Sequence, residues 1–167
     1  HCFISAFDER IVKYKMQHSM KTDQPRIAVI IQKQIASDVS GVAFSLNPQN
    51  NCYDEAVINS NFGLGETIVA GQVTPDTFTV DMLKKEILEK KIAKKDHALW
   101  LKKSGGTVKR SNKNPKKPSL TDKQAKEVAK LAGDAEKFFG KPMDIEWAYE
   151  GKKLYLLQAR PITTYLP

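Results

Sequence analysis

Residues 144–161 read Asp-Ile-Glu-Trp-Ala-Tyr-Glu-Gly-Lys-Lys-Leu-Tyr-Leu-Leu-Gln-Ala-Arg-Pro and carry the clearest structural signal in the chain. Apolar and polar residues alternate on both sides of Gly151, and the side chains of a β-strand point to opposite faces with a period of two. A glycine between two such runs favours a tight turn. This stretch therefore predicts two strands joined at Gly151.

The length of the turn decides which side chains of this hairpin face each other. With a loop of three residues, 151–153, Glu146 faces Gln158 and Asp144 faces Arg160, so the four polar side chains project from one end of one face. A loop of two residues shifts the register by one and places the carboxylates on the opposite face from the amide and the guanidinium. A site that uses all four side chains together requires the first register.

These four side chains suit a phosphate and metal site. Two carboxylates and an amide oxygen are hard ligands for Mg²⁺, which proteins commonly share with nucleotide phosphates. A guanidinium beside them can stabilise charge on a transferring phosphoryl group. The alternative is an ordinary cross-strand ion pair between Asp144 and Arg160 with Glu146 solvated, because surface hairpins often carry charges. The spacing of the residues alone does not distinguish a phosphate and metal site from an ordinary ion pair.

The chain upstream begins with helical spacing. Apolar residues recur at intervals of four, four and three, which predicts one stripe of a helix that ends before Pro25. These residues are Phe3, Phe7, Ile11 and Tyr14. Residues 27–31 are a short run of mostly β-branched residues and predict a strand covered on both faces.

The middle of the chain predicts further strands. Four runs bounded by turn residues read as strands, at 41–46, 55–59, 77–81 and 86–93. The turn-rich segment 47–51 predicts a hairpin between the first two, and 67–70 a single helical turn. In the lysine-rich part only 107–110 is expected to be extended, between loops at 104–106 and 111–119.

A second helix is predicted after residue 120. Thr121 and Gln124 match a capping box, and Gly140 followed by Pro142 supplies a stop. One face of this helix is expected to hold Ala125, Val128, Ala129, Ala132, Ala135 and Phe139. Together with the strands, the pattern predicts an α+β fold, mainly an antiparallel sheet with flanking helices.

Length and composition fit a globular protein. The 167 residues suit one domain spanning 1–167, and 41% hydrophobic and 28% charged residues are ordinary for a folded chain. The longest apolar stretch is far shorter than the about 20 residues of a membrane span. Cys2 and Cys52 show no metal-site spacing, so we expect reduced thiols in a cytoplasmic protein. Since residue 1 is not Met and no signal-peptide order follows, the sequence is expected to start within a longer protein.

The net charge of +8 raises the possibility of a nucleic-acid partner. Much of the charge comes from lysine doublets between Lys84 and Lys117, in a stretch with few aromatic residues that could stack on bases. This distribution favours a solvated surface. A basic nucleic-acid-binding module remains the alternative from a different functional class.

Residues 144–148 and 154–163 closely resemble the end of the ATP-binding domain of phosphoenolpyruvate synthases and pyruvate phosphate dikinases. Other segments match that family in the same order: Gln32-Lys33, residues 37–44, 62–66 and 69–71, and Pro75-Asp76. The resemblance covers nearly the whole chain except the lysine-rich stretch from about Lys84 to Ser119.

The resemblance implies an ATP-grasp-like fold in which two α+β subdomains hold ATP between them, this chain being the second. It implies that Glu146 and Gln158 lie at Mg²⁺ and the phosphates, and that Arg160 contacts the phosphates as the catalytic cation. Gln32 would lie beside the nucleotide. Asp144 would be a further metal ligand or would support one. The implied cofactors are ATP and Mg²⁺.

The family's upstream half and its swivelling phosphohistidine domain are not in this sequence. Both are therefore expected as partners within a full-length protein, and the chain alone is not expected to complete a reaction. The implied reaction is phosphorylation of pyruvate through a phosphohistidine. A rifamycin phosphotransferase, which shares the ATP-binding domain, stays open as a second enzyme.

Gly63 and Gly65 flank Leu64 in a segment that could be a phosphate loop or a turn. No P-loop lysine follows, so a packing or turn role is favoured.

Overall fold

The computed structural model describes residues 3–22 and 27–163. The chain divides into two compact units, His1–Gln34 and Ile35–Pro167, and each is described by itself. The expectation of one domain over residues 1–167 stays a prediction.

The first unit contains a short 3₁₀ helix, η1 (Ile4–Phe7), and the helix α1 (Glu9–Gln17). The side chain of Asp8 caps α1 by accepting a hydrogen bond from the amide of Arg10 at 3.0 Å. The predicted N-terminal helix is confirmed for residues 9–17, which end before residue 25, but residues 4–7 form a separate 3₁₀ helix because the backbone of Asp8 is not helical.

The strand predicted at residues 27–31 is wrong. The segment has no helix or strand, and Ile30 and Ile31 are 87% and 97% exposed. A β-branched run forms a strand only where a neighbouring strand supplies hydrogen bonds and packing. Within the described residues of this unit there is no other strand to supply them.

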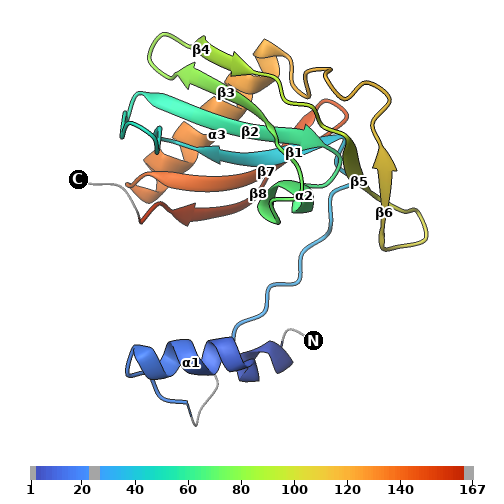
Figure 1. Cartoon of the computed structure of the whole chain (residues 1–167). Coiled ribbons are helices and arrows are strands. Elements are labelled where there is room, and N and C mark those ends of the chain that lie inside the picture. Colours follow the sequence, from blue (N-terminus) through green and yellow to red (C-terminus); the bar gives the residue numbers. More distant parts are fainter. Residues whose placement is uncertain (1–2, 23–26, 164–167) are drawn as a thin grey trace. The chain divides into compact units, whose positions relative to one another are not determined.

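The described part of the second unit is built on a six-stranded antiparallel sheet, here called the main sheet (Figure 1). Its spatial order is β4-β3-β2-β1-β7-β8, so pairing of β1 with β7 brings the C-terminal hairpin beside the first strand of the unit. The bounds are β1 Val39–Phe44, β2 Glu55–Phe62, β3 Asp76–Asp81, β4 Glu86–Lys91, β7 Met143–Glu150 and β8 Lys153–Pro161. The predicted α+β fold and the predicted strands in these regions are confirmed.

The long helix α3 (Asp122–Phe139) packs on one face of the main sheet (Figure 1). Its capping box is confirmed, because Thr121 Oγ1 accepts from the Gln124 amide at 3.3 Å and the Thr121 amide donates to Gln124 Oε1 at 3.0 Å. Gly140 ends the helix in the left-handed region at φ +69°. The buried core joins apolar residues of the helix and the sheet, among them Ala125, Val128, Ala132, Phe78, Ile145 and Trp147.

The prediction for Phe139 is wrong, since this side chain is 48% exposed. It is the last residue of α3 and contacts the ring of Phe138, with ring centroids 5.0 Å apart.

A smaller two-stranded sheet pairs β5 (His97–Leu101) with β6 (Thr107–Ser111). The sequence predicted only the second of these strands. The backbone of Gly63 runs close to β5, and a Cβ on this glycine would lie 2.1 Å from the Leu99 carbonyl oxygen. Because Gly63 also has φ +70°, its role in close packing and turning is explained. The short helix α2 (Glu66–Val69) follows, which confirms the predicted helical turn.

No helix among the described residues is long and apolar enough to cross a membrane. The thiol of Cys52 is free, and Cys2 lies outside the described residues.

Candidate functional site

The turn between β7 and β8 contains two residues, because Glu150 pairs directly with Lys153. Of the two loop lengths that the sequence left open, the two-residue loop is the one present. A β-bulge beside Glu146 then shifts the register by one, so that Glu146 pairs with Gln158 and Asp144 with Arg160. A bulge adds one residue to one strand and re-aims the side chains beyond it. The predicted pairing of the four polar residues is confirmed, although by a different route.

The four residues lie on the face of the main sheet opposite α3. Ile145, between the two carboxylates, is fully buried in the core shared with α3, and neighbours in a strand point to opposite faces. We call this opposite side the open face. The short helix α2 reaches one end of it, where the Asn61 amide donates to Thr67 Oγ1 at 3.1 Å.

Two rows of side chains cross the open face from β8 to β4. Each row follows directly opposite residues on neighbouring strands, whose Cβ atoms typically lie about 4.5–5.5 Å apart. One row is Gln158, Glu146, Val42, Asn59, Thr77 and Lys91, and the other is Arg160, Asp144, Phe44, Val57, Thr79 and Glu89. Strand pairing thus joins the predicted hairpin residues to polar side chains more than 50 residues away in the sequence.

Asp144 holds the guanidinium of Arg160. Both Nε and Nη2 of Arg160 lie 2.8 Å from the same oxygen, Oδ2. The Asp144 side chain is only 12% exposed, and its other oxygen, Oδ1, is buried without a hydrogen-bond partner among the described residues. An unsatisfied buried acceptor is costly, so a donor or cation that reached this oxygen would be bound favourably.

Glu146 and Gln158 lie beside this pair without engaging it. Glu146 is half-buried and Gln158 exposed, and neither side chain makes a hydrogen bond or ion pair with another described residue. Their oxygens are therefore available to a ligand. The described residues contain no cluster of three or more His, Cys, Asp or Glu side chains that could hold a metal. A cation here would rely on two carboxylates, the amide oxygen and ligands from outside the chain.

Sequence reasoning missed the part of the open face on β2, β3 and β4. Thr77 Oγ1 donates to Asn59 Oδ1 at 2.9 Å, in line with Glu146. Beyond it a cavity of about 330 Å³ is bordered by Thr77, Thr79 and Lys91. The signal was the alternation of polar and apolar residues along these strands, which marks two different faces.

Gln32, the remaining predicted ligand, belongs to the first unit. It lies in a segment without helix or strand, and the structure does not place that unit relative to the main sheet. Its position beside a nucleotide stays a prediction.

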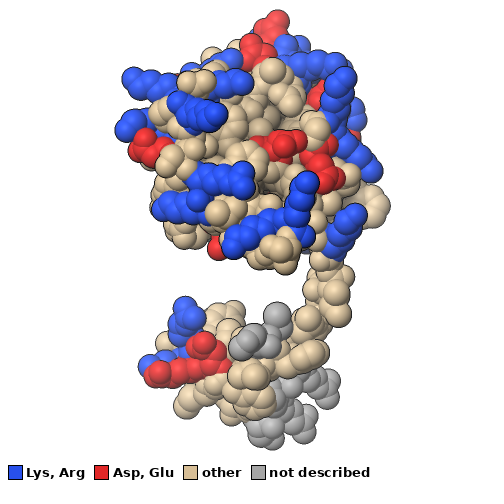
Figure 2. Space-filling model, turned by 90° about the vertical axis from the view of Figure 1, so that its right-hand side faces the viewer, with Lys and Arg blue, Asp and Glu red and all other residues tan. Residues whose placement is uncertain are grey.

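The positive charge of the chain is concentrated in one segment. Residues 84–117 contain 13 Lys and Arg against three Asp and Glu, an excess of ten that exceeds the net +8 of the whole chain. On the face that Figure 2 shows, Lys and Arg side chains are spread out with acidic side chains among them. Several of these lysines form surface ion pairs, such as Lys91 with Glu89 at 2.8 Å and Lys94 with Asp96 at 2.9 Å. The arrangement favours a solvated surface over a single nucleic-acid track.

Comparison with known proteins gives a family for this chain. The family described as "Pyruvate phosphate dikinase, AMP/ATP-binding domain" matches residues 1–166. A probable phosphoenolpyruvate synthase of Methanocaldococcus jannaschii is 42% identical over 165 residues, covering 98% of this chain and 14% of that protein. A similar protein from Archaeoglobus fulgidus is 41% identical, covering 98% of this chain and 22% of the relative.

Rifampicin phosphotransferases are similar as well. The protein from Bacillus cereus is 37% identical over 168 residues, which cover 99% of this chain and 19% of the relative. The chain thus spans 14–22% of the length of these relatives. Because the family match extends over nearly every residue, the chain belongs to the pyruvate phosphate dikinase AMP/ATP-binding domain family.

Proposed function

We propose that the open face is half of an Mg-ATP site in a phosphotransferase similar to phosphoenolpyruvate synthase. The observation that carries the proposal is the pairing across β7 and β8. It brings a buried, unsatisfied carboxylate oxygen, a free carboxylate, a free amide and a guanidinium together on one uncovered end of the ATP-grasp-like sheet.

The donor set fits Mg²⁺. Asp144 Oδ1, the Glu146 carboxylate and the Gln158 amide oxygen are hard oxygen ligands, and Mg²⁺ usually completes its shell with water and phosphate oxygens. When bound, the cation would neutralise phosphate charge. Arg160, held by Asp144, would contact the phosphates and stabilise negative charge as the phosphoryl group leaves.

Catalysis would need parts of the protein beyond this chain. The proposed acceptor of the phosphoryl group is a histidine on a swivelling domain, which would pass it to pyruvate, and a preceding subdomain would close the ATP site. The isolated chain would therefore bind ATP weakly and complete no turnover. The similarity to rifampicin phosphotransferases supports a second candidate acceptor, rifampicin. Assays of the full-length enzyme with each acceptor distinguish the two.

The test is calorimetric titration of the chain with ATP, with Mg²⁺ and with EDTA. We expect weak, Mg²⁺-dependent binding that is lost in Glu146→Ala and in Arg160→Ala. The matched controls are Glu150→Ala, at the exposed end of the same strand, and Arg110→Ala in β6, which should bind as the unaltered chain does. Binding that survives both site substitutions would contradict the assignment. If the unaltered chain does not bind, the same variants are to be compared in the full-length enzyme.

A further inference from the structure

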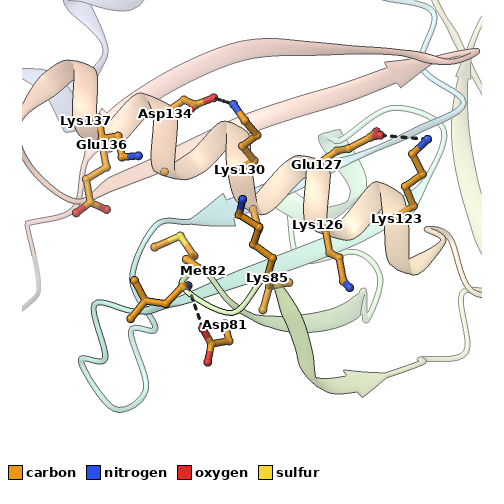
Figure 3. Close-up of a pocket in the computed structure, with 14 residues that line it drawn as sticks. Asp81, Met82, Lys85, Lys123, Lys126, Glu127, Lys130, Asp134, Glu136 and Lys137 are labelled. Carbon is orange, nitrogen blue, oxygen red and sulfur yellow. Dashed lines mark hydrogen bonds and ion pairs between the residues drawn. The ribbon is translucent and has the colours of Figure 1, made fainter.

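A second hollow lies on the other side of the main sheet, between α3 and the turn that joins β3 to β4 (Figure 3). Its volume is about 760 Å³, within the range of roughly 300–1,000 Å³ typical of small-molecule sites. We call it the α3 groove. The main sheet separates it from the four polar residues of the proposed ATP site, which does not use it.

The floor of the α3 groove is apolar. Val80 and Met82 line it from the sheet side and Ala129 from the helix, while Leu83 at the turn is 73% exposed. Apolar side chains that meet solvent in a concave site favour a ligand with a hydrocarbon or aromatic body.

Gly133 keeps the groove open. It occupies the interior of α3, where glycine is less favourable than alanine. Packing does not require it, because a Cβ at this position would meet only Met82 Sδ, at an ordinary contact distance of 3.5 Å. The helix thus carries a destabilising residue at the position where a larger side chain would fill the groove.

Charged side chains form the rim (Figure 3). Most of the acidic ones already accept hydrogen bonds or form an ion pair. Glu127 accepts from the Tyr149 hydroxyl at 2.7 Å, and burial together with this bond raises the pKa of Tyr149. Asp134 lies 2.5 Å from Lys130. Asp81 accepts from two backbone amides of its own turn.

The lysines of the rim are mostly unpaired. Lys85, Lys126 and Lys137 line the groove and make no ion pair or hydrogen bond with another described residue. Three unpaired ammonium groups around an apolar floor attract an anion. One acceptor, Oε2 of Glu136, is buried and receives no hydrogen bond from any described residue, so an N–H group of the ligand could donate to it.

We propose that the α3 groove binds an apolar carboxylate that also carries an amide N–H. Its carboxylate is held by the unpaired lysines, its apolar body lies on Met82 and Ala129 in the space left by Gly133, and its N–H reaches Glu136.

The test uses N-decanoylglycine, titrated into the ¹⁵N-labelled full chain and followed by amide chemical shifts. We expect saturable shifts at Lys85, Ala129 and Gly133. Charge reversal in Lys126→Glu should weaken binding by about fivefold, since an exposed ion pair contributes modestly. Lys141→Glu, an exposed substitution outside the groove, should leave it unchanged.

Gly133→Leu is the decisive variant, because leucine fills the groove while it favours the helix. We expect it to melt at or above the temperature of the unaltered chain and to show no ligand-induced shifts. Two further compounds separate the contributions, N-acetylglycine, which lacks the apolar body, and the methyl ester of N-decanoylglycine, which lacks the charge. Both should bind at least tenfold more weakly. The proposal would be overturned by chemical-shift changes outside the groove or by binding that Gly133→Leu retains. It would also be overturned by equal affinity for the methyl ester, or by no binding at millimolar concentrations of N-decanoylglycine.

Discussion

Two ion pairs anchored on the main sheet, Asp76 with Lys95 and Asp144 with Arg160, join a carboxylate to a cation in opposite surroundings. Both side chains of the first pair are 0% exposed, whereas those of the second are 12% and 62% exposed. Asp76 accepts further hydrogen bonds, whereas one oxygen of Asp144 has no hydrogen-bond partner in the described part of the chain. A carboxylate–cation pair therefore stabilises the fold where it is buried and fully bonded, whereas the pair at the surface keeps an oxygen that a ligand could reach.

The buried pair fastens the lysine-rich segment to β3. Asp76 Oδ1 accepts from Lys95 Nζ at 2.5 Å and from the Ala93 amide at 2.9 Å. Its other oxygen accepts from both the amide and the hydroxyl of Ser119, at 2.8 and 2.7 Å, and that hydroxyl also lies 2.7 Å from Ser60 Oγ. Ala93 and Lys95 precede β5 and Ser119 follows β6, so Asp76 ties together the two ends of the stretch that contains the small sheet. A buried charge is tolerated only with such complete bonding.

The largest expected effect is that of Lys95→Met, which leaves Asp76 buried without its cation. The free energy of unfolding should fall by about 3–5 kcal/mol, measured by urea titration. Lys94→Met is the matched control, since the Lys94–Asp96 pair is exposed and should be worth less than about 1 kcal/mol. Equal losses in the two variants would show that the buried pair does not fasten the segment.

An intermediate effect is expected for Ser119→Ala. The substitution removes one hydrogen-bond donor to Asp76 and the hydrogen-bond partner of Ser60. The free energy of unfolding should therefore fall by about 1–3 kcal/mol, which is the cost of leaving buried polar groups unsatisfied. Thermal and urea denaturation measure it, with the exposed Ser111→Ala in β6 as control. If Ser119→Ala is as stable as the control, the network does not depend on this hydroxyl.

The smallest effect on stability is expected for Asp144→Asn, because its partner Arg160 is largely exposed. The loss should be less than about 1 kcal/mol. The affinity for Mg-ATP should nevertheless fall, since the substitution removes a carboxylate and frees the guanidinium. Urea titration and calorimetry on the same preparation separate the two quantities, with Asp96→Asn as the control. A stability loss comparable to that of Lys95→Met would show that the exposed pair stabilises the fold as much as the buried pair does.

Local patterns predicted most elements of the second unit. The capping box at Thr121 and the glycine at 140 identified α3, since caps act through bonds to neighbouring residues. Alternation identified the strands of the main sheet and the polar residues of β7 and β8 that share one face. The failures depended on distant partners. The run at 27–31 has strand-forming residues, but the described part of its own unit contains no strand to pair with it. β5 forms by pairing with β6 and by passing close to Gly63.

The sequence by itself determined the family, the hairpin and the alternation that places Asp144 and Glu146 on one face, because these follow from residues adjacent in the chain. Only the tertiary structure showed that a bulge corrects the register after a turn of two residues, that Asn59 and Thr77 continue the row of Glu146, and that Asp76 is a structural carboxylate. Strand pairing and burial are set by residues far apart in the sequence. Their free energies depend on which groups remain unsatisfied once the chain is folded, and that is decided in three dimensions.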